Sequence, residues 1–341
     1  MRTRVLIILT VAAALMAAAA VAAPKGKKKA RSPRKAKTEK IVEKKPERRA
    51  LVNVAAACLR TQPSHASQLE TQASYGTPVS ILDQQGEWYR IEIPDGYKAW
   101  IIGSSIVEKT QEEINAWRQA QRLVVTRPQQ ASAWNDSINT TDGNVAFDIV
   151  LGSIFEGAKK PGARYAELTL PDGRRGYAMA SDVADFAEWS RHTPSVDTVL
   201  DNARAFMGVT YLWGGTTPKA MDCSGLTKLC YGAAGLILPR NASDQARIGQ
   251  TLDPAQPETF RRGDLLFFGT GDGTVVTHVG IYDGFTRYIH ASGRVYESSF
   301  NPSHPLYIPR KVIGACRIIG ADSQKGITTY AEHPMYFNQS K

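Results

Sequence analysis

Cys223 has the residue type and the local setting that a nucleophilic thiol requires. It lies in residues 211–225, which read Tyr-Leu-Trp-Gly-Gly-Thr-Thr-Pro-Lys-Ala-Met-Asp-Cys-Ser-Gly. A helical pattern follows directly, with apolar residues at helical spacing and a glycine stop signal (Leu226, Leu229, Cys230, Ala233 and Gly235). A thiol in the first turn of a helix faces unpaired N–H groups and the positive end of the helix dipole, which favour the thiolate. The pattern therefore predicts a reactive cysteine at a helix N-terminus.

Two histidines downstream of Cys223 could supply a base and its orienting partner. His278 lies in Val-Val-Thr-His-Val-Gly-Ile-Tyr and His290 lies in Arg-Tyr-Ile-His-Ala-Ser-Gly, and both runs are strand-like. The intervening Tyr-Asp-Gly-Phe at 282–285 favours a hairpin turn, so paired strands could bring the two rings side by side. A Cys–His–His set is a variant of the nucleophile–base–orienter arrangement of covalent catalysis.

Four motifs in a fixed order make the prediction more specific. They are Asp-Cys-Ser-Gly at 222–225, Arg-Gly-Asp-Leu-Leu-Phe-Phe at 262–268, His-Val-Gly-Ile-Tyr at 278–282 and His-Ala at 290–291. Together they resemble the NlpC family of papain-like cysteine peptidases, which cut bacterial cell-wall peptides, over roughly residues 194–322. The resemblance implies an α+β papain-like catalytic domain, in which one helix presents the cysteine to an antiparallel sheet that carries both histidines.

The resemblance also implies catalytic roles. Cys223 would be the nucleophile, His278 the general base and His290 the group that orients His278. Tyr211 would help to stabilise the oxyanion alongside the backbone N–H of Cys223. No metal and no cofactor is needed for this chemistry.

Substrate contacts follow from family members in which a preceding β-barrel closes one end of the cleft. There a turn tyrosine and the acidic residue before the nucleophile hold the free α-amine of the substrate, and these positions are Tyr97 and Asp222 here. Gln68 stands where an acidic partner of this pair would be expected. The other expected contacts, to the dipeptide backbone, the D-glutamate carboxylate or the substrate in general, are Ser224, Ser243 and Trp213.

Other interpretations of these residues remain open at this point. Cys223, His278 and His290 are also of the types that bind zinc, although no close-spaced pair such as Cys-x-x-Cys accompanies them. Cys230 is better explained as a small core residue. The glycine-rich run at 269–273 is followed by no helical pattern, which favours a loop between strands over a phosphate-binding loop.

The N-terminus predicts export. Residues 1–22 combine two arginines with an apolar run that ends in Ala-Val-Ala, the pattern of a signal peptide, with a retained anchor as the alternative. The mature protein would be periplasmic, or secreted and associated with the cell wall. The four cysteines leave at most one disulfide if Cys223 is free.

Most of the basic character belongs to a short segment. Residues 1–50 carry 15 Lys and Arg against three Glu, a surplus of 12 positive charges, whereas the whole chain has a formal charge of +10. The remaining residues therefore sum to −2. Residues 23–50 have too few apolar residues to offset chain entropy, so we expect a disordered linker. It could be attracted to anionic membrane or wall polymers or act as a solvated tether, and we expect no nucleic-acid partner.

The middle of the chain contains a weak internal repeat. Residues 88–96 match residues 165–173 at an offset of 77, and both segments end in Pro-Asp-Gly. Period-two alternation broken by such turns predicts short antiparallel strands. We therefore expect two small all-β barrels, at 51–108 and 122–190, which resemble bacterial SH3-like domains. A linker helix at 109–121 would join them, and a C-terminal tail at 323–341 would follow the catalytic domain.

These features together predict a monomeric cysteine peptidase that acts on peptidoglycan-derived peptides. The expected reaction is hydrolysis of the bond between γ-D-glutamate and the diamino acid in muropeptides with a free N-terminal L-Ala. The alternatives are an endopeptidase or amidase on polymeric peptidoglycan and, with the catalytic domain silent, a wall-binding protein.

Overall fold

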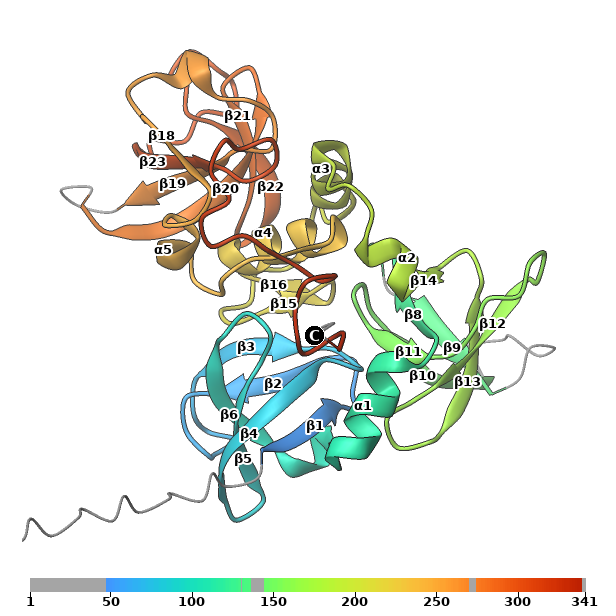
Figure 1. Cartoon of the computed structure of the whole chain (residues 1–341). Coiled ribbons are helices and arrows are strands. Elements are labelled where there is room, and N and C mark those ends of the chain that lie inside the picture. The colour runs from blue at the N-terminus through green and yellow to red at the C-terminus, as the bar shows by residue number, and fades with distance from the viewer. Residues whose placement is uncertain (1–46, 130, 136–143, 270–273, 339–341) are drawn as a thin grey trace, which may run out of the picture. The chain divides into compact units, whose positions relative to one another are not determined.

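The structure is a computed structural model that describes residues 47–129, 131–135, 144–269 and 274–338 (Figure 1). The predicted signal peptide, the predicted linker as far as residue 46 and most of the glycine-rich run after Gly269 lie outside the described residues. Within the described ranges, no helix is both long and apolar enough to cross a membrane.

The first part of the described chain is a seven-stranded antiparallel sheet with the strand order β3-β2-β6-β5-β4-β1-β7. Its strands are β1 (Arg48–Val52), β2 (Ala57–Arg60), β3 (Leu69–Ala73), β4 (Pro78–Gln85), β5 (Trp88–Glu92), β6 (Lys98–Ile102) and β7 (Ile106–Lys109). The predicted boundary at 51 is wrong, because β1 begins at Arg48. Ala50 is fully buried in the sheet core, while the Arg48 guanidinium stays at the surface and pairs with Glu108 at 2.8 Å.

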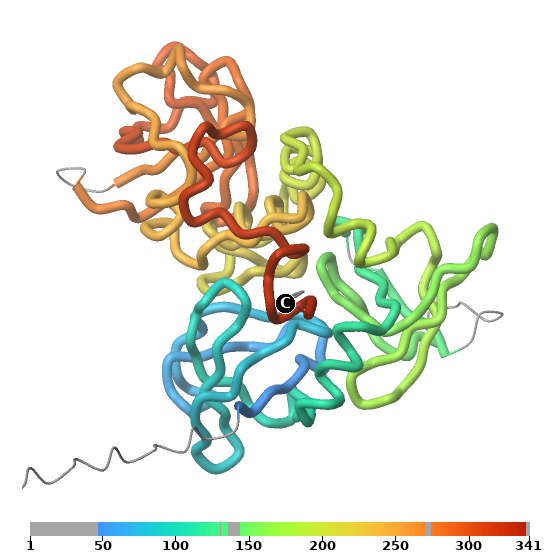
Figure 2. Tube along the Cα trace, viewed as in Figure 1, coloured from blue at the N-terminus to red at the C-terminus, as the bar shows by residue number. Residues whose placement is uncertain are grey.

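A second seven-stranded sheet repeats the first strand for strand, in the order β10-β9-β13-β12-β11-β8-β14. Its strands are β8 (Arg122–Val125), β9 (Ala131–Trp134), β10 (Val145–Ile149), β11 (Ile154–Glu156), β12 (Tyr165–Thr169), β13 (Arg175–Met179) and β14 (Val183–Asp185). Between the sheets lies helix α1 (Gln111–Gln119), which begins with a capping box formed by Thr110 and Glu113. Helix α2 (Phe186–Ser190) follows the second sheet, and the chain path can be traced in Figure 2.

The last part of the chain packs helices against one face of a six-stranded antiparallel sheet with the order β18-β23-β19-β20-β21-β22. Its strands are β18 (Gln250–Leu252), β19 (Leu265–Gly269), β20 (Val276–Gly284), β21 (Arg287–Ser292), β22 (Arg294–Ser299) and β23 (Val312–Arg317). The helices are α3 (Val196–Ala205), α4 (Cys223–Ala233) and α5 (Ala242–Gln245), and the short pairs β15 (Thr216–Thr217) with β16 (Ala220–Met221) and β17 (Leu236–Ile237) with β24 (Thr328–Thr329) complete the part.

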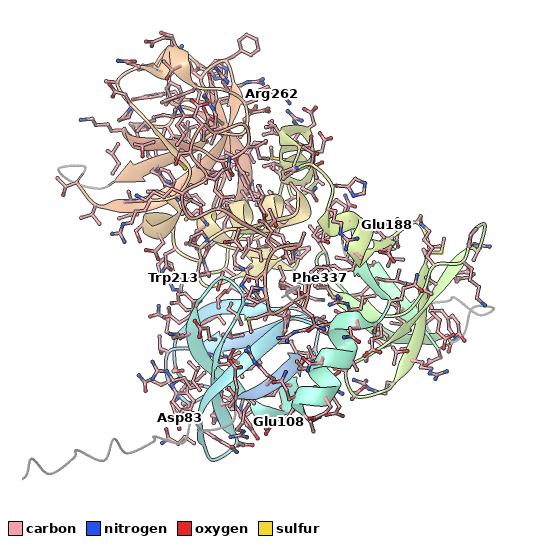
Figure 3. The ribbon with its side chains drawn as sticks, in the orientation of Figure 1. Asp83, Glu108, Glu188, Trp213, Arg262 and Phe337 are labelled. Carbon is pink, nitrogen blue, oxygen red and sulfur yellow. The ribbon has the colours of Figure 1, made fainter. Side chains whose placement is uncertain are left out.

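The segment predicted as a C-terminal tail is largely packed structure, which corrects the boundary at 322. Its strand β24 pairs with β17, and Tyr336 is only 4% exposed. Phe337, labelled in Figure 3, stacks on Phe186. The Arg122 guanidinium lies 5.0 Å from the ring centroid of Phe337 and 4.8 Å from that of Phe186. The segment therefore joins the part with the six-stranded sheet, which corresponds to the predicted catalytic domain and is called the catalytic part below, to the second sheet. The contacts are aromatic and cation–π interactions.

Candidate active site

Helix α4 begins at Cys223, at the position that the sequence pattern predicts. Asp222 is the N-cap, and its side chain accepts a hydrogen bond of 2.7 Å from the Gly225 N–H. The backbone N–H of Cys223, in the first turn, has no partner within the helix and can point at a developing negative charge. The thiol is 8% exposed and forms backbone hydrogen bonds with Ser224 and with Val279 of β20.

Strands β20 and β21 bring the two predicted histidines together. His278 Nε2 lies 2.7 Å from His290 Nδ1, and His290 Nε2 lies 2.9 Å from the Ser298 hydroxyl on β22. If His278 is to accept a proton at Nδ1, this network assigns the other protons: His278 Nε2–H donates to His290, and His290 Nε2–H donates to Ser298. The chain of hydrogen bonds holds the His278 ring in one orientation. Ser298 was not predicted from the sequence. It lies on β22, the strand that pairs with β21.

Burial keeps the reacting groups neutral in the free protein. It raises the pKa of the Cys223 thiol to about 11, with the Asp222 carboxylate adding to the effect. Burial likewise lowers the pKa of His278 to about 3 and that of His290 to about 2. Burial therefore opposes the thiolate that the helix N-terminus favours.

Alkylation of the thiol should report this directly. In a Cys58→Ser background, which removes the one partly exposed cysteine outside the site, iodoacetamide should modify Cys223 at a rate that rises through pH 8 and 9 without reaching a plateau. At neutral pH the rate should be about 100-fold below that of an unperturbed thiol, because the pKa lies about two units higher. A plateau already reached near pH 6 would show a thiolate–imidazolium pair instead.

The hydroxyl of Tyr211 is the group of this residue that could donate a hydrogen bond to an oxyanion. Its backbone N–H donates to the Gly293 carbonyl at 2.9 Å, so only the side chain remains as a donor. Burial, with the nearby Cys223 thiol, raises the pKa of Tyr211 to about 12, which keeps the hydroxyl protonated. Tyr211 lines the cavities on both sides of the reacting pair, as an oxyanion donor would.

A cavity of about 460 Å³ opens at the Cys223 end of α4. Four of the five predicted substrate-binding residues line it: Asp222, Ser224, Ser243 and Trp213, of which Trp213 is 61% exposed (Figure 3). The cavity also contains Glu70, which comes from the first sheet, and Arg240, and neither was predicted from the sequence.

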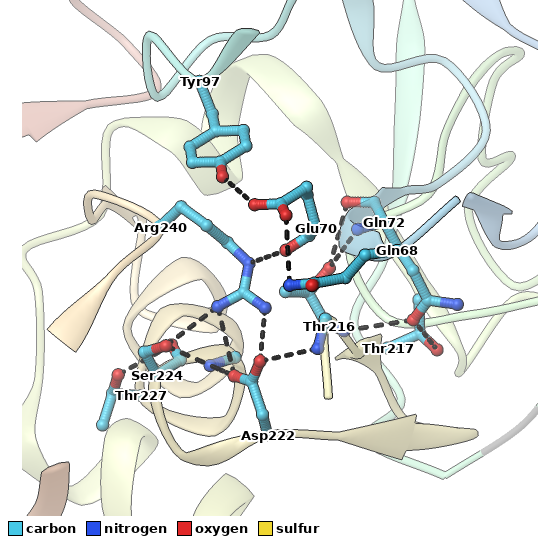
Figure 4. Close-up of polar contacts among 12 residues, drawn as sticks. Gln68, Glu70, Gln72, Tyr97, Thr216, Thr217, Asp222, Ser224, Thr227 and Arg240 are labelled. Atoms are coloured by element: carbon cyan, nitrogen blue, oxygen red, sulfur yellow. Dashed lines mark hydrogen bonds and ion pairs between the residues drawn. The ribbon is translucent and has the colours of Figure 1, made fainter. Parts of the chain in front are cut away.

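Arg240 and Asp222, which both line this cavity, form a buried ion pair (Figure 4). Both guanidinium ends of Arg240 donate to the carboxylate, and its Nη1 also donates to the Ser224 hydroxyl at 2.8 Å. Asp222 accepts further hydrogen bonds from the backbone N–H groups of Gly214, at 2.9 Å, and Gly225. Its oxygens are therefore largely occupied by the protein itself. Nothing local in Leu-Pro-Arg-Asn at 238–241 marks Arg240 as buried, so no sequence pattern could have predicted this ion pair.

Tyr97, the fifth predicted residue, reaches the cavity through Glu70. Its hydroxyl donates to the Glu70 carboxylate, and Gln68 Nε2 donates to the same group at 3.3 Å (Figure 4). Burial and this hydrogen bond raise the pKa of Tyr97. The acidic side chain that contacts Tyr97 is Glu70 of β3, two residues after Gln68, the position at which an acidic partner was expected. Period-two alternation could have predicted this position, because it places Glu70 and Gln72 on one face of the strand.

The same face of β3 attaches the first sheet to the catalytic part. Thr216 donates its N–H to the Gln72 side chain and its hydroxyl to the Gln72 carbonyl, at 3.1 and 3.0 Å. Gly214 has φ +83°, and a Cβ there would lie 2.7 Å from the Leu69 carbonyl oxygen, so the approach requires glycine. These contacts fix Glu70 beside the N-terminus of α4.

Comparison with known proteins identifies two parts of the chain. Residues 208–315 match the NlpC/P60 family, whose peptidases are cysteine peptidases, and residues 55–107 match the bacterial SH3 domain. The gamma-D-glutamyl-L-lysine dipeptidyl-peptidase of Bacillus cereus is 28% identical over 67% of this chain and 68% of its own length. Dipeptidyl-peptidase 6 of Lysinibacillus sphaericus is 26% identical over 76% of this chain and 94% of that protein.

Solved structures agree on the fold. The crystal structure of an NlpC/P60 family protein from Bacillus cereus superposes with a TM-score of 0.67 at 24% identity, covering 80% of this chain and 99% of that one. This likeness supports the order of parts described above. The chain thus consists of a bacterial SH3 domain followed, after a second sheet, by an NlpC/P60 domain, and it is homologous to the gamma-D-glutamyl-L-lysine dipeptidyl-peptidases.

Proposed function

We propose that the protein is a cysteine peptidase that hydrolyses the bond between γ-D-glutamate and the diamino acid in muropeptides with a free N-terminal L-Ala. One observation carries the proposal: the cavity that contains Cys223 also contains the Glu70 carboxylate, delivered by the first sheet. An anion at this end of the cavity suits a substrate whose first residue carries an ammonium group. The peptidase activity for which the homologous dipeptidyl-peptidases are named supports the same reaction class.

Glu70 is a better amine ligand than Asp222. A carboxylate has about four acceptor sites, and the Glu70 carboxylate accepts from the Tyr97 hydroxyl and the Gln68 amide. It therefore retains acceptor capacity for an ammonium group. Asp222, by contrast, is engaged by Arg240, Ser224 and two backbone N–H groups. We propose that Glu70, together with Tyr97, binds the α-amine of the substrate. Asp222 instead forms the ion pair with Arg240 and so stabilises this end of the cavity.

In the proposed mechanism, Cys223 is the nucleophile and His278 is the general base. As Cys223 Sγ attacks the γ-carbonyl carbon, its proton passes to Nδ1 of His278, and the carbonyl oxygen becomes an oxyanion. The Cys223 backbone N–H and the Tyr211 hydroxyl stabilise that oxyanion, an interaction of roughly 3–4 kcal/mol for each donor. The C–N bond then breaks and His278 returns the proton to the departing amine. Water attacks the thioester carbon and gives a proton to His278. The C–S bond then breaks, the dipeptide leaves with a new γ-carboxyl group, and His278 returns the proton to Cys223 Sγ.

The test compares L-Ala-γ-D-Glu-meso-diaminopimelate with its N-acetylated form. The wild-type protein should cleave the free-amine peptide at least about 100-fold faster in kcat/KM, since an acetylated amine leaves the half-buried Glu70 carboxylate without its charged partner. Glu70→Gln should reduce that preference by about 10- to 100-fold, whereas Glu87→Gln, at an exposed position in the turn between β4 and β5, should leave it unchanged.

The other outcomes point to other functions. Equal cleavage of both peptides would mean that the end of the cavity is open, and would favour action on polymeric peptidoglycan. Binding to insoluble wall without any hydrolysis would make the protein a wall-binding protein and refute the mechanism.

We also propose that residues 1–22 direct export and that the second sheet is another SH3-like unit. The strand-for-strand agreement between the two sheets supports the second point. An exported enzyme would meet its muropeptide substrates in the periplasm or at the wall. Detection of a mature N-terminus near residue 23 in the exported fraction would support the first point, and an intact N-terminus would contradict it.

A further inference from the structure

A second cavity lies on the other side of the reacting pair. Its volume is about 630 Å³, and His278 lines it as Cys223 lines the first. Tyr211 and Thr277 line both cavities, so the scissile bond would lie at their junction. A peptide whose N-terminal dipeptide occupies the cavity of Glu70 must place its departing amino acid in this second cavity.

The two cavities differ in charge. The first contains the Glu70 carboxylate and the Asp222–Arg240 ion pair, whose charges cancel, whereas the described lining of the second contains Arg310 and Lys311 and no acidic residue. Arg310 donates to the Ser292 hydroxyl at 3.2 Å, which holds the guanidinium against the cavity wall. Arg310 is half-buried and Lys311 is exposed. The cleft is therefore negative at the amine end and positive at the departing end.

Arg310 lies close enough to the reacting centre for its charge to be felt there. After burial, its positive charge is the cause that further lowers the pKa of His278, and it has the same effect on His290. A guanidinium at that place can form a bidentate hydrogen bond to a carboxylate of the departing residue, either the one next to the scissile amide or one at the end of its side chain.

We propose that this second cavity binds the departing diamino acid through its carboxylates, with Arg310 as the main ligand and Lys311 as the second cation, and thereby selects diaminopimelate over lysine. This inference rests on the proposed function. Diaminopimelate differs from lysine by one more carboxylate, on the carbon that carries the side-chain amine. Its side-chain end is zwitterionic, whereas that of lysine is a lone ammonium group, which two cations repel. The homologous enzymes named for a lysine substrate would then differ from this one in the departing residue.

The experiment uses three peptides that share L-Ala-γ-D-Glu and end in meso-diaminopimelate, in meso-diaminopimelate whose side-chain carboxylate is an amide, or in L-Lys. For the wild-type protein, kcat/KM should be about 10- to 100-fold higher for the first peptide than for the other two, the range expected for hydrogen bonds to a charged group. Arg310→Gln should remove most of this difference, because it weakens the hold on the extra carboxylate and reduces the repulsion of the lysine ammonium group. Arg261→Gln, at an exposed arginine outside both cavities, is the matched control.

A binding measurement separates recognition from chemistry. In the Cys223→Ala protein, calorimetric titration should give a Kd for the diaminopimelate peptide that rises about tenfold or more on adding Arg310→Gln. Equal wild-type rates on all three peptides, or an equal loss on all three in Arg310→Gln, would overturn the assignment and leave the proposed function standing. Failure of the wild-type protein to cleave any of the three would instead overturn the proposed function, and the assignment with it.

Discussion

Cys223→Ala should lower kcat/KM for L-Ala-γ-D-Glu-meso-diaminopimelate by at least about 10⁴-fold, the loss typical of removing the nucleophile from a catalytic set. The cause is chemical, because His278, His290 and Ser298 would keep their hydrogen bonds without the sulfur. The melting temperature should change little, since the thiol is a small group at the cavity surface. Rates would be followed by mass spectrometry of the released dipeptide, and stability by thermal unfolding.

Cys230→Ala is the matched control, because it removes the same atom from the same helix. Cys230 is fully buried in the core between α4 and the sheet. Its replacement should cost about 1 kcal/mol of unfolding free energy through a small cavity and leave kcat within a few-fold of the wild type. Turnover in Cys223→Ala above a few per cent of the wild-type rate would refute the assignment of the nucleophile. So would an inactive Cys230→Ala protein that is still folded.

The catalytic part could be predicted well from the sequence because its signals are local. The helix that begins at Cys223 has its N-cap and its apolar stripe within a dozen residues. The two histidines lie in adjacent strands of one hairpin, so pairing alone brings them together. The repeat likewise predicted two sheets with one topology, because each turn and each alternation is read within a few residues.

The parts that were missed depend on contacts between segments far apart in the chain. The place of Glu70 depends on which face of β3 meets Thr216, which is 144 residues away from Gln72. Aromatic residues of the C-terminal segment pack on α2 and Arg122, which no local pattern announces. The effect of burial on the pKa of Cys223 was missed for a related reason: the helix N-terminus is visible in the sequence, whereas burial of the thiol is a property of the assembled site.

Arg240→Met should be the most destabilising of the substitutions considered, costing about 3–5 kcal/mol of unfolding free energy. The substitution leaves Asp222, which is 5% exposed, as a buried carboxylate without its ion-pair partner. Removing one partner of a buried ion pair costs far more free energy than the intact pair contributes to stability. Arg240 Nε also donates to the Glu70 carbonyl at 3.0 Å, so the same change should loosen the strand that carries the amine ligand. Folded Arg240→Met protein should therefore lose preference for the free-amine peptide as well as stability.

Two further variants show whether the unpaired charge is the cause. Asp222→Asn combined with Arg240→Met removes both charges and keeps an N-cap acceptor, so the double variant should be more stable than Arg240→Met alone. Arg247→Met breaks an exposed pair with Asp244, where the arginine side chain is 74% exposed, and should cost less than about 1 kcal/mol. Denaturant unfolding of the four proteins measures these differences. If Arg240→Met costs no more than Arg247→Met, or if the double variant is less stable than the single one, then the ion pair does not hold the cavity floor, and the position of Glu70 must depend on the contacts of Gln72 with Thr216.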